Sequence, residues 1–263
     1  MKIGLVQMKP EFGAVSKNID RGLSLIKQGT SDLWILPELF SSGYQFRSEE
    51  EARSLAEPVP NGPTTTALIS ASRELNAFIC GGLPELDGTT VYNSSVLVGP
   101  DGLISVYRKI HLFFHEKEVF SPGNLPFSVA DIAAAKVGMM ICFDHFFPES
   151  TRTLALRGAQ IIAHPANLVM PVYAQVNMRA GALSNAVFTA TANRVGEESR
   201  TAETLHFTGR SEIVSPSGEI LASLSPTEEC TQVVEIDPEA ALQKELNPLN
   251  DRFGDRRPSF YET

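Results

Sequence analysis

The sequence predicts a single α/β domain built as a layered sandwich. Short aliphatic and β-branched runs alternate with segments whose apolar residues recur at helical spacing. Two similar hairpin patterns, one in each half of the chain, indicate an internally pseudo-symmetric arrangement. Pro-, Gly- or Ser-rich stretches long enough to link two domains do not occur, so residues 1–263 are expected to form one domain.

The first half of the chain begins with a strand followed by a helix. Residues 3–7 form a short, mostly aliphatic run that is typical of a strand. Apolar residues from Val15 to Ile26 then share one helical face, with Gly29 as the expected end of the helix. The next expected elements are a strand at 33–36, a helix at 64–75, a strand at 77–81, and a hairpin of 91–98 and 103–107 around Gly99-Pro100-Asp101-Gly102.

The second half repeats the same alternation. Residues 137–141 are typical of a buried strand, and a helix is expected over 148–157, with Pro148 at its first position and Gly158 after its end. A strand at 161–163 follows. The second hairpin pairs 212–214 with 219–224 around Ser215-Pro216-Ser217-Gly218.

Composition excludes several classes of function. The formal net charge of −9 disfavours binding to nucleic acid or anionic membranes, because both depend on an excess of Lys and Arg. No apolar run approaches the roughly 18 residues of a transmembrane helix. The three cysteines, Cys80, Cys142 and Cys230, are too few and too scattered for a disulfide framework. A reducing compartment, the cytoplasm, is therefore expected.

Common cofactor and nucleophile motifs are missing from the sequence. It contains no G-x-G-x-x-G, no G-x-x-x-x-G-K-[ST], no G-x-S-x-G and no H-E-x-x-H. No cofactor is therefore expected. His111 and His115 have a spacing that could place two metal ligands on a helix, but no third ligand block accompanies them, so no metal site is predicted.

Three reactive side chains stand at the ends of strand-like runs. Glu38 follows DLWILP, Lys109 follows LISVYR, and Cys142 follows KVGMMI. Each alone fits an ordinary role, as a solvated acid, a surface cation or a buried thiol. Together they suit nucleophilic attack on a carbon bonded to nitrogen, with the thiol as nucleophile and the carboxylate as its base. Lys109 is expected to lower the pKa of the thiol and, with the backbone N–H of Phe143, to stabilise the tetrahedral intermediate.

Three sequence blocks carry a resemblance to a known family. PELFSSGY at 37–44, YRKIHLF at 107–113 and GMMICFDHFFPE at 138–149 closely resemble the nitrilase superfamily of carbon–nitrogen hydrolases, and the likeness extends over essentially the whole chain. The resemblance implies that Glu38 is the general base, Lys109 stabilises the intermediate and Cys142 is the nucleophile. A second glutamate that positions substrate is implied shortly after the lysine, at Glu116, with Glu118 as the alternative.

The resemblance also implies how the chain folds and assembles. It implies an α-β-β-α sandwich that pairs into a four-layered homodimer or a higher homo-oligomer, with the tail at 251–263 packing across the dimer. The substrate implied is a small aliphatic amide or nitrile. Tyr44, Phe143 and Asn167 are candidate pocket residues, although Asn167 also suits a Pro-bounded turn.

Amide and nitrile substrates are not separated by the sequence. Cys142-Phe143-Asp144 resembles the amidase branches, whereas AHPANLVMP and ANRVGEE resemble small archaeal nitrilases. An omega-amidase, an N-carbamoyl amine amidohydrolase and a partner-dependent glutaminase-like protein stay open as alternatives.

Overall fold

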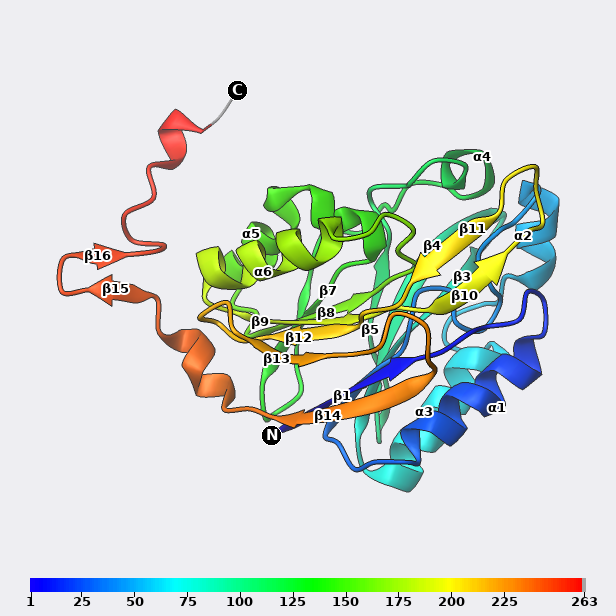
Figure 1. Ribbon diagram of the computed structural model, residues 1–263, viewed down its shortest axis with the longest axis horizontal. Helices are drawn as coiled ribbons and strands as arrows, with labels where there is room; N and C mark the ends of the chain where they lie inside the picture. Colours follow the sequence, from blue (N-terminus) through cyan, green and yellow to red (C-terminus); the bar gives the residue numbers. More distant parts are fainter. Residues whose placement is uncertain (262–263) are drawn as a thin grey trace.

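Two six-stranded sheets lie face to face, with helices on the outer side of each. The computed structural model describes residues 1–261 (Figure 1). The strand order is β14-β1-β2-β3-β4-β5 in the first sheet and β13-β12-β9-β8-β7-β6 in the second. This is the α/β sandwich that the sequence predicts, with the layer order α-β-β-α.

The first sheet comes from the N-terminal half and one late strand. Its parallel centre is β1, β2 and β3, and β4, β5 and β14 are antiparallel to their neighbours. Its strands and the three N-terminal helices are β1 (Lys2–Gln7), β2 (Leu33–Ile35), β3 (Phe78–Asp87), β4 (Thr90–Gly99), β5 (Gly102–Arg108), β14 (Cys230–Glu235), α1 (Val15–Ile26), α2 (Glu49–Leu55) and α3 (Pro63–Leu75).

The second sheet has the same plan. Its parallel centre is β7, β8 and β9, flanked by antiparallel β6 on one side and the β12–β13 hairpin on the other. Its strands and covering helices are β6 (Val129–Asp131), β7 (Lys136–Met139), β8 (Ile161–Pro165), β9 (Phe188–Ala192), β12 (Glu212–Val214), β13 (Ile220–Ser223), α5 (Pro148–Leu156) and α6 (Tyr173–Asn185). Each predicted hairpin thus occupies one edge of its own sheet, in agreement with the expected pseudo-symmetry.

The main core fills the space between the sheets. Alternate residues of β1 separate the two sides of the first sheet: Ile3 and Leu5 face the second sheet, while Val6 belongs to the cluster beneath α1 and α3. From the second sheet, Met139 and Ile161 pack into the same central core. Because this core joins the sheets, it fixes the relative position of groups carried by different sheets.

The remaining segments are not part of the two six-stranded sheets. They are α4 (Glu116–Val119), the hairpin of β10 (Val195–Glu198) and β11 (Leu205–Thr208), the short 3-10 helices η1 (Cys142–Phe146), η2 (Pro238–Leu242) and η3 (Pro258–Phe260), and β15 (Glu245–Asn247) with β16 (Asn250–Asp251). Figure 1 shows β15, β16 and η3 extending away from the sandwich. Residues 262 and 263 of the expected packing tail lie outside the described residues.

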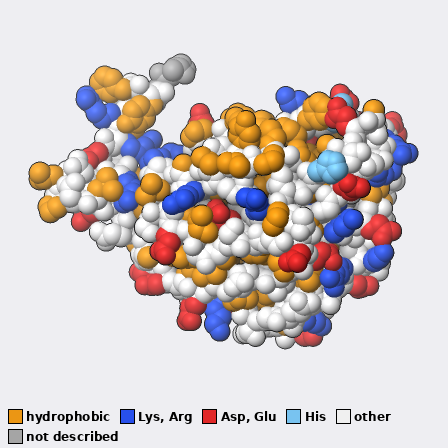
Figure 2. Space-filling view, in the orientation of Figure 1, with side chains coloured by type: hydrophobic (Ala, Val, Ile, Leu, Met, Phe, Trp, Pro, Cys, Tyr) orange, Lys and Arg blue, Asp and Glu red, His pale blue; other side chains and the backbone are white. Residues whose placement is uncertain are grey.

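The outer face of α5 and α6 carries apolar side chains. Figure 2 shows hydrophobic side chains gathered along this edge of the molecule. Exposed residues here are Phe146, Leu156, Val172, Tyr173, Val176 and Leu183. Within residues 1–261, no helix has the length and apolar character that crossing a membrane requires.

Candidate active site

The three strand-end residues converge where the two sheets meet. Glu38 follows β2 by three residues, Lys109 directly follows β5, and Cys142 follows β7 by three residues. The side chains of Glu38 and Lys109 are buried, and Cys142 is 5% exposed. One sheet therefore supplies the carboxylate and the ammonium group, and the other supplies the thiol.

Lys109 is held between two carboxylates. Its Nζ donates hydrogen bonds of 2.7 Å to Oε1 of Glu38 and 2.7 Å to Oε1 of Glu116. Glu116, the first residue of α4, also accepts a 2.9 Å hydrogen bond from the backbone N–H of Phe113 through its other oxygen. Glu118 instead projects into solvent, 3.2 Å from Nδ1 of His115. The structure thus places Glu116, not Glu118, against the lysine.

Within residues 1–261, one carboxylate oxygen of Glu38 is hydrogen-bonded and the other is not. Asn93 Nδ2 donates a 2.7 Å hydrogen bond to Oε1, the same atom that Lys109 contacts. Among the described residues, Oε2 of Glu38 has no hydrogen-bond partner, although it is buried. Burial raises the pKa of Glu38 to about 7, against the opposing charge of Lys109. A buried carboxylate with this pKa and an open oxygen can exchange protons near neutral pH.

The other two groups carry strongly shifted pKa values. Burial acts to lower the pKa of Lys109, but the charges of Glu116 and Glu38 outweigh it and the pKa is raised, so the amine stays an ammonium ion. Burial, followed by the charge of Glu38, raises the pKa of the Cys142 thiol well above its usual value. Lys109 and the backbone N–H of Asn167 act in the lowering direction. Lys109 thus acts on the thiol pKa in the expected direction, but burial outweighs its charge, so the net pKa is raised.

Two glycines allow the backbone to bring these groups together. A Cβ on Gly82 would lie 2.6 Å from the backbone nitrogen of Leu39 and 2.7 Å from Cα of Glu38. A Cβ on Gly123 would lie 2.1 Å from the carbonyl oxygen of Arg108, and the Gly123 N–H bonds the carbonyl of Lys109. A side chain at either position would displace a catalytic candidate.

Cys142 lies on a sharp turn that Asp144 stabilises. Its φ is 42°, in the left-handed region that non-glycine residues seldom adopt. Oδ2 of Asp144 accepts hydrogen bonds from the backbone N–H of Ile141 and from the hydroxyl of Tyr107, at 2.8 and 2.7 Å. Oδ1 lies 2.7 Å from Nδ1 of His111. Asp144 thus connects the turn of the thiol to the segment that carries Lys109.

The two histidines considered as metal ligands have separate partners. His111 bonds Asp144 and stacks on Phe147 with ring centroids 3.7 Å apart. His115 contacts Glu118 instead. Their side chains therefore serve different local structures.

The three pocket candidates lie around the cluster. Asn167 follows β8 and donates from Nδ2 to the carbonyl of Glu38 at 2.9 Å. It lines a small cavity of about 20 Å³ together with Cys142 and Phe143. Tyr44 lies beside Glu116, and burial together with the nearby charges of Glu116, Glu38 and Cys142 raises its pKa. All three candidates therefore border the reactive groups.

The buried ion pair of Arg194 and Glu198 holds the backbone of Tyr44 and Gln45. The carboxylate of Glu198 accepts from the backbone N–H of Tyr44 at 3.2 Å and of Gln45 at 2.6 Å, and Arg194 Nη1 donates to it at 2.5 Å. Sequence reasoning missed this pair and the roles of Asn93 and Asp144. Glu198 and Arg194 occur in the ANRVGEE block, and Asp144 occurs beside the nucleophile, which is the only signal that could have drawn attention to them.

Comparison with known proteins agrees with this fold and identifies a family. Residues 2–243 match the carbon–nitrogen hydrolase family. The chain is 50% identical to a nitrilase of Pyrococcus abyssi over 264 residues, covering 99% of each chain. It is 36% identical to an omega-amidase of Xenopus laevis, covering 84% of this chain and 83% of that protein.

A solved structure has the same fold. The carbon–nitrogen hydrolase of Helicobacter pylori G27 superposes with a TM-score of 0.89 at 27% identity, covering 99% of this chain and 96% of the other. The chain belongs to the carbon–nitrogen hydrolase family, within the nitrilase superfamily. It is an enzyme that acts on C–N bonds other than peptide bonds.

Proposed function

We propose that this enzyme hydrolyses small amides or nitriles to a carboxylic acid and ammonia, with Cys142 as nucleophile. The observation that supports it most strongly is the buried cluster in which Lys109 bridges Glu38 and Glu116 while Oε2 of Glu38 stays open. The cluster borders the cavity that contains Cys142. It combines a nucleophile, a base and a fixed cation in a site shielded from water.

In amide hydrolysis, Glu38 takes the proton of the thiol as the sulfur attacks the carbonyl carbon. Because the thiol pKa is raised, the thiolate forms only as the carboxylate accepts this proton. Lys109, positioned by Glu116, stabilises the negative charge that develops on the substrate oxygen. Glu38 then gives the proton to the nitrogen, ammonia leaves, and a thioester to Cys142 remains.

Water completes the reaction. Glu38 removes a proton from a water molecule that attacks the thioester carbon, the C–S bond breaks, and the thiol regains its proton. A nitrile would first give a thioimidate, which one water converts to the thioester with loss of ammonia, and a second water releases the acid. The same three residues serve both reactions, and the similarity to a nitrilase and to an omega-amidase supports each substrate class.

Ammonia release from matched amides and nitriles tests the proposal. The panel contains short amides, carbamoyl amines and mononitriles, with Cys142→Ala as the control. We expect turnover by the wild type and none by the variant. Turnover by Cys142→Ala at a comparable rate would overturn the thiol mechanism. Inactivity of the wild type on every substrate, with Cys142 still alkylated by iodoacetamide, would instead favour a partner-dependent enzyme.

We also propose that the protein forms a homodimer in the cytoplasm. A second copy of the chain can bury two exposed apolar regions. One is the outer face of α5 and α6, and the other is the projecting segment with Leu246 and Leu249, which are 61% and 87% exposed. The three free cysteines fit a reducing compartment. Light scattering of the purified chain tests the assembly: a monomer that Val176→Glu leaves unchanged would contradict it.

A further inference from the structure

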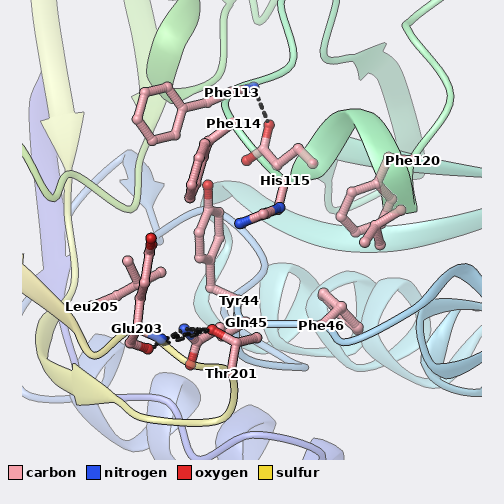
Figure 3. Close-up of a pocket in the computed structure, with 12 residues that line it drawn as sticks. Tyr44, Gln45, Phe46, Phe113, Phe114, His115, Phe120, Thr201, Glu203 and Leu205 are labelled. Atoms are coloured by element: carbon pink, nitrogen blue, oxygen red, sulfur yellow. Dashed lines mark hydrogen bonds between the residues drawn. The ribbon is translucent and has the colours of Figure 1, made fainter.

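A second cavity lies beside the catalytic cluster and has walls made largely of aromatic rings. It has a volume of about 40 Å³. We call it the aromatic cavity and define it by Tyr44, Phe113, Phe114, His115, Phe120 and Leu205. Figure 3 shows the ring of Tyr44 in its centre, with Phe113 and Phe114 on one side and Phe120 on the other. Phe114 is half exposed, so the cavity is open to solvent.

The aromatic cavity adjoins the reactive groups. Glu116, which positions Lys109, lies in its wall together with Tyr44, and the nearby charge of Glu116 helps to raise the pKa of Tyr44. Phe113 lines both this cavity and the smaller one that contains Cys142. An acyl group whose reacting carbon lies at Cys142 therefore extends past Phe113 and Tyr44 to reach the larger space.

The ionised side chains that line this path are acids, and the ammonium of Lys109 beside it is already paired. Of the described residues that line the two cavities, none is a lysine or an arginine. The ammonium of Lys109 is already shared between two carboxylates, and the only ring nitrogens on the rim of the aromatic cavity belong to His115, which contacts Glu118. Glu116 and Glu203 both line the cavity. A carboxylate placed here would lose water, find no cation and face two acids.

We propose that the aromatic cavity binds the acyl group of the substrate and selects acyl groups that are uncharged and apolar. Amides and nitriles of aliphatic or aryl acids fit this chemistry, whereas amides that carry a distal carboxylate do not. The inference rests on the proposed hydrolase function and narrows its substrate class. It also decides against the omega-amidase alternative, since omega-amides end in a carboxylate.

The experiment compares substrates of equal length that differ in their distal end. Hexanamide is paired with glutaramate, pentanamide with succinamate, and hexanenitrile with 4-cyanobutanoate, and kcat/KM is measured from ammonia release. In each pair of which at least one member is hydrolysed, we expect kcat/KM for the neutral substrate to be at least about 100-fold higher than for the charged one. Equal or better turnover of glutaramate would overturn the inference and leave the hydrolase function intact. Absence of turnover for all six would overturn the proposed function and this inference with it.

Two variants test the cavity itself. Glu203→Gln removes one acid from the rim and is expected to raise kcat/KM for glutaramate relative to hexanamide by up to about fivefold, as for an exposed charge. Leu205→Ser makes the wall polar and is expected to lower the ratio of hexanamide to acetamide turnover about tenfold.

Matched variants elsewhere on the surface control for general effects. Glu74→Gln on α3 and Ile104→Ser on β5 remove an acid and an apolar side chain that do not line either cavity. We expect both substrate ratios to stay at their wild-type values in these two variants. Ratios that stay unchanged in Leu205→Ser as well would show that the acyl group binds elsewhere.

Discussion

Replacing Lys109 by Met is expected to destabilise the protein strongly as well as to inactivate it. The Nζ atom lies 2.7 Å from a carboxylate oxygen of both Glu38 and Glu116, and neither acid is more than 4% exposed. Met has a similar length but no charge, so the variant leaves two buried carboxylates without their cation. Removal of one partner from a buried ion pair lowers the free energy of unfolding by about 3–5 kcal/mol.

The loss depends on pH in a defined direction. Lys109 lowers the pKa of Glu38, so the variant has a higher folded-state pKa at this residue than the wild type has. The folded variant then binds a proton that the unfolded chain has already released above pH about 4.5. Below pH 7 the folded wild type holds the same proton, because its own Glu38 pKa is about 7. The stability of the variant relative to the wild type therefore falls as the pH rises through about 7 and above, and the deficit is smaller at acidic pH.

Urea denaturation and thermal melting at pH 5.5 and pH 8.5 measure this effect. A loss of about 3–5 kcal/mol corresponds to a fall in Tm of about 6–20 °C for a chain of this size. Lys109→Met/Glu116→Gln removes one of the unpaired charges and is expected to regain part of the loss. Lys17→Met is the exposed control, because its partner Glu11 is 61% exposed, and it should change stability by less than about 1 kcal/mol. Equal stability of Lys109→Met and wild type at both pH values would refute the reasoning.

Three further outcomes are expected. The rate kcat/KM should fall below pH 7 as Glu38, with a pKa of about 7, takes up a proton, and a flat profile from pH 5 to 8 would contradict its role as base. Gly82→Ala should lower kcat at least tenfold, because the added Cβ displaces Glu38, while the circular dichroism spectrum stays native. A wild-type kcat in this variant would show that Gly82 does not need to be a glycine for Glu38 to be placed correctly. Asp144→Asn should lower the free energy of unfolding by about 1–3 kcal/mol in urea, because an amide NH₂ cannot accept all the bonds the carboxylate accepts; an unchanged value would contradict this.

The parts of the fold that the sequence predicts well are those with strong local patterns. The helix from Val15 and the strand from Lys2 carry clear apolar periodicity, and the structure has both close to their expected limits. The Pro148 start of α5 is also as expected. Each of these elements buries its apolar side directly, so the spacing of apolar residues is sufficient evidence.

The parts that the sequence does not predict depend on distant partners or on small residues. The buried side of α6 has one large apolar residue, Met178, among small or polar ones, while Val176 and Leu183 face outward. No continuous apolar stripe therefore marks its buried side. Strand β14 pairs with β1 from the opposite end of the chain. Neither the buried side of α6 nor the partner of β14 can be read from the residues of that segment alone.

The candidate site shows the same division. The positions of Glu38, Lys109 and Cys142 at strand ends could be predicted because strand ends are visible in the sequence. The contact of Lys109 with Glu116 rather than Glu118 depends on the turn at α4, and the raised pKa of the thiol depends on burial. Both are properties of the assembled structure, and a single sequence gives no measure of either.

The hydrogen bond from Asn167 to the carbonyl of Glu38 joins equivalent ends of β8 and β2, one from each half of the chain. A ribosome-bound chain or a proteolytic fragment that ends before β7 holds Glu38 and Lys109 but not Cys142, and the complementary fragment holds Cys142 without either. On the proposed mechanism, hydrolytic activity therefore arises only when both halves have docked. Loss of activity should accompany the earliest separation of the sheets during unfolding, before either sheet loses its strands.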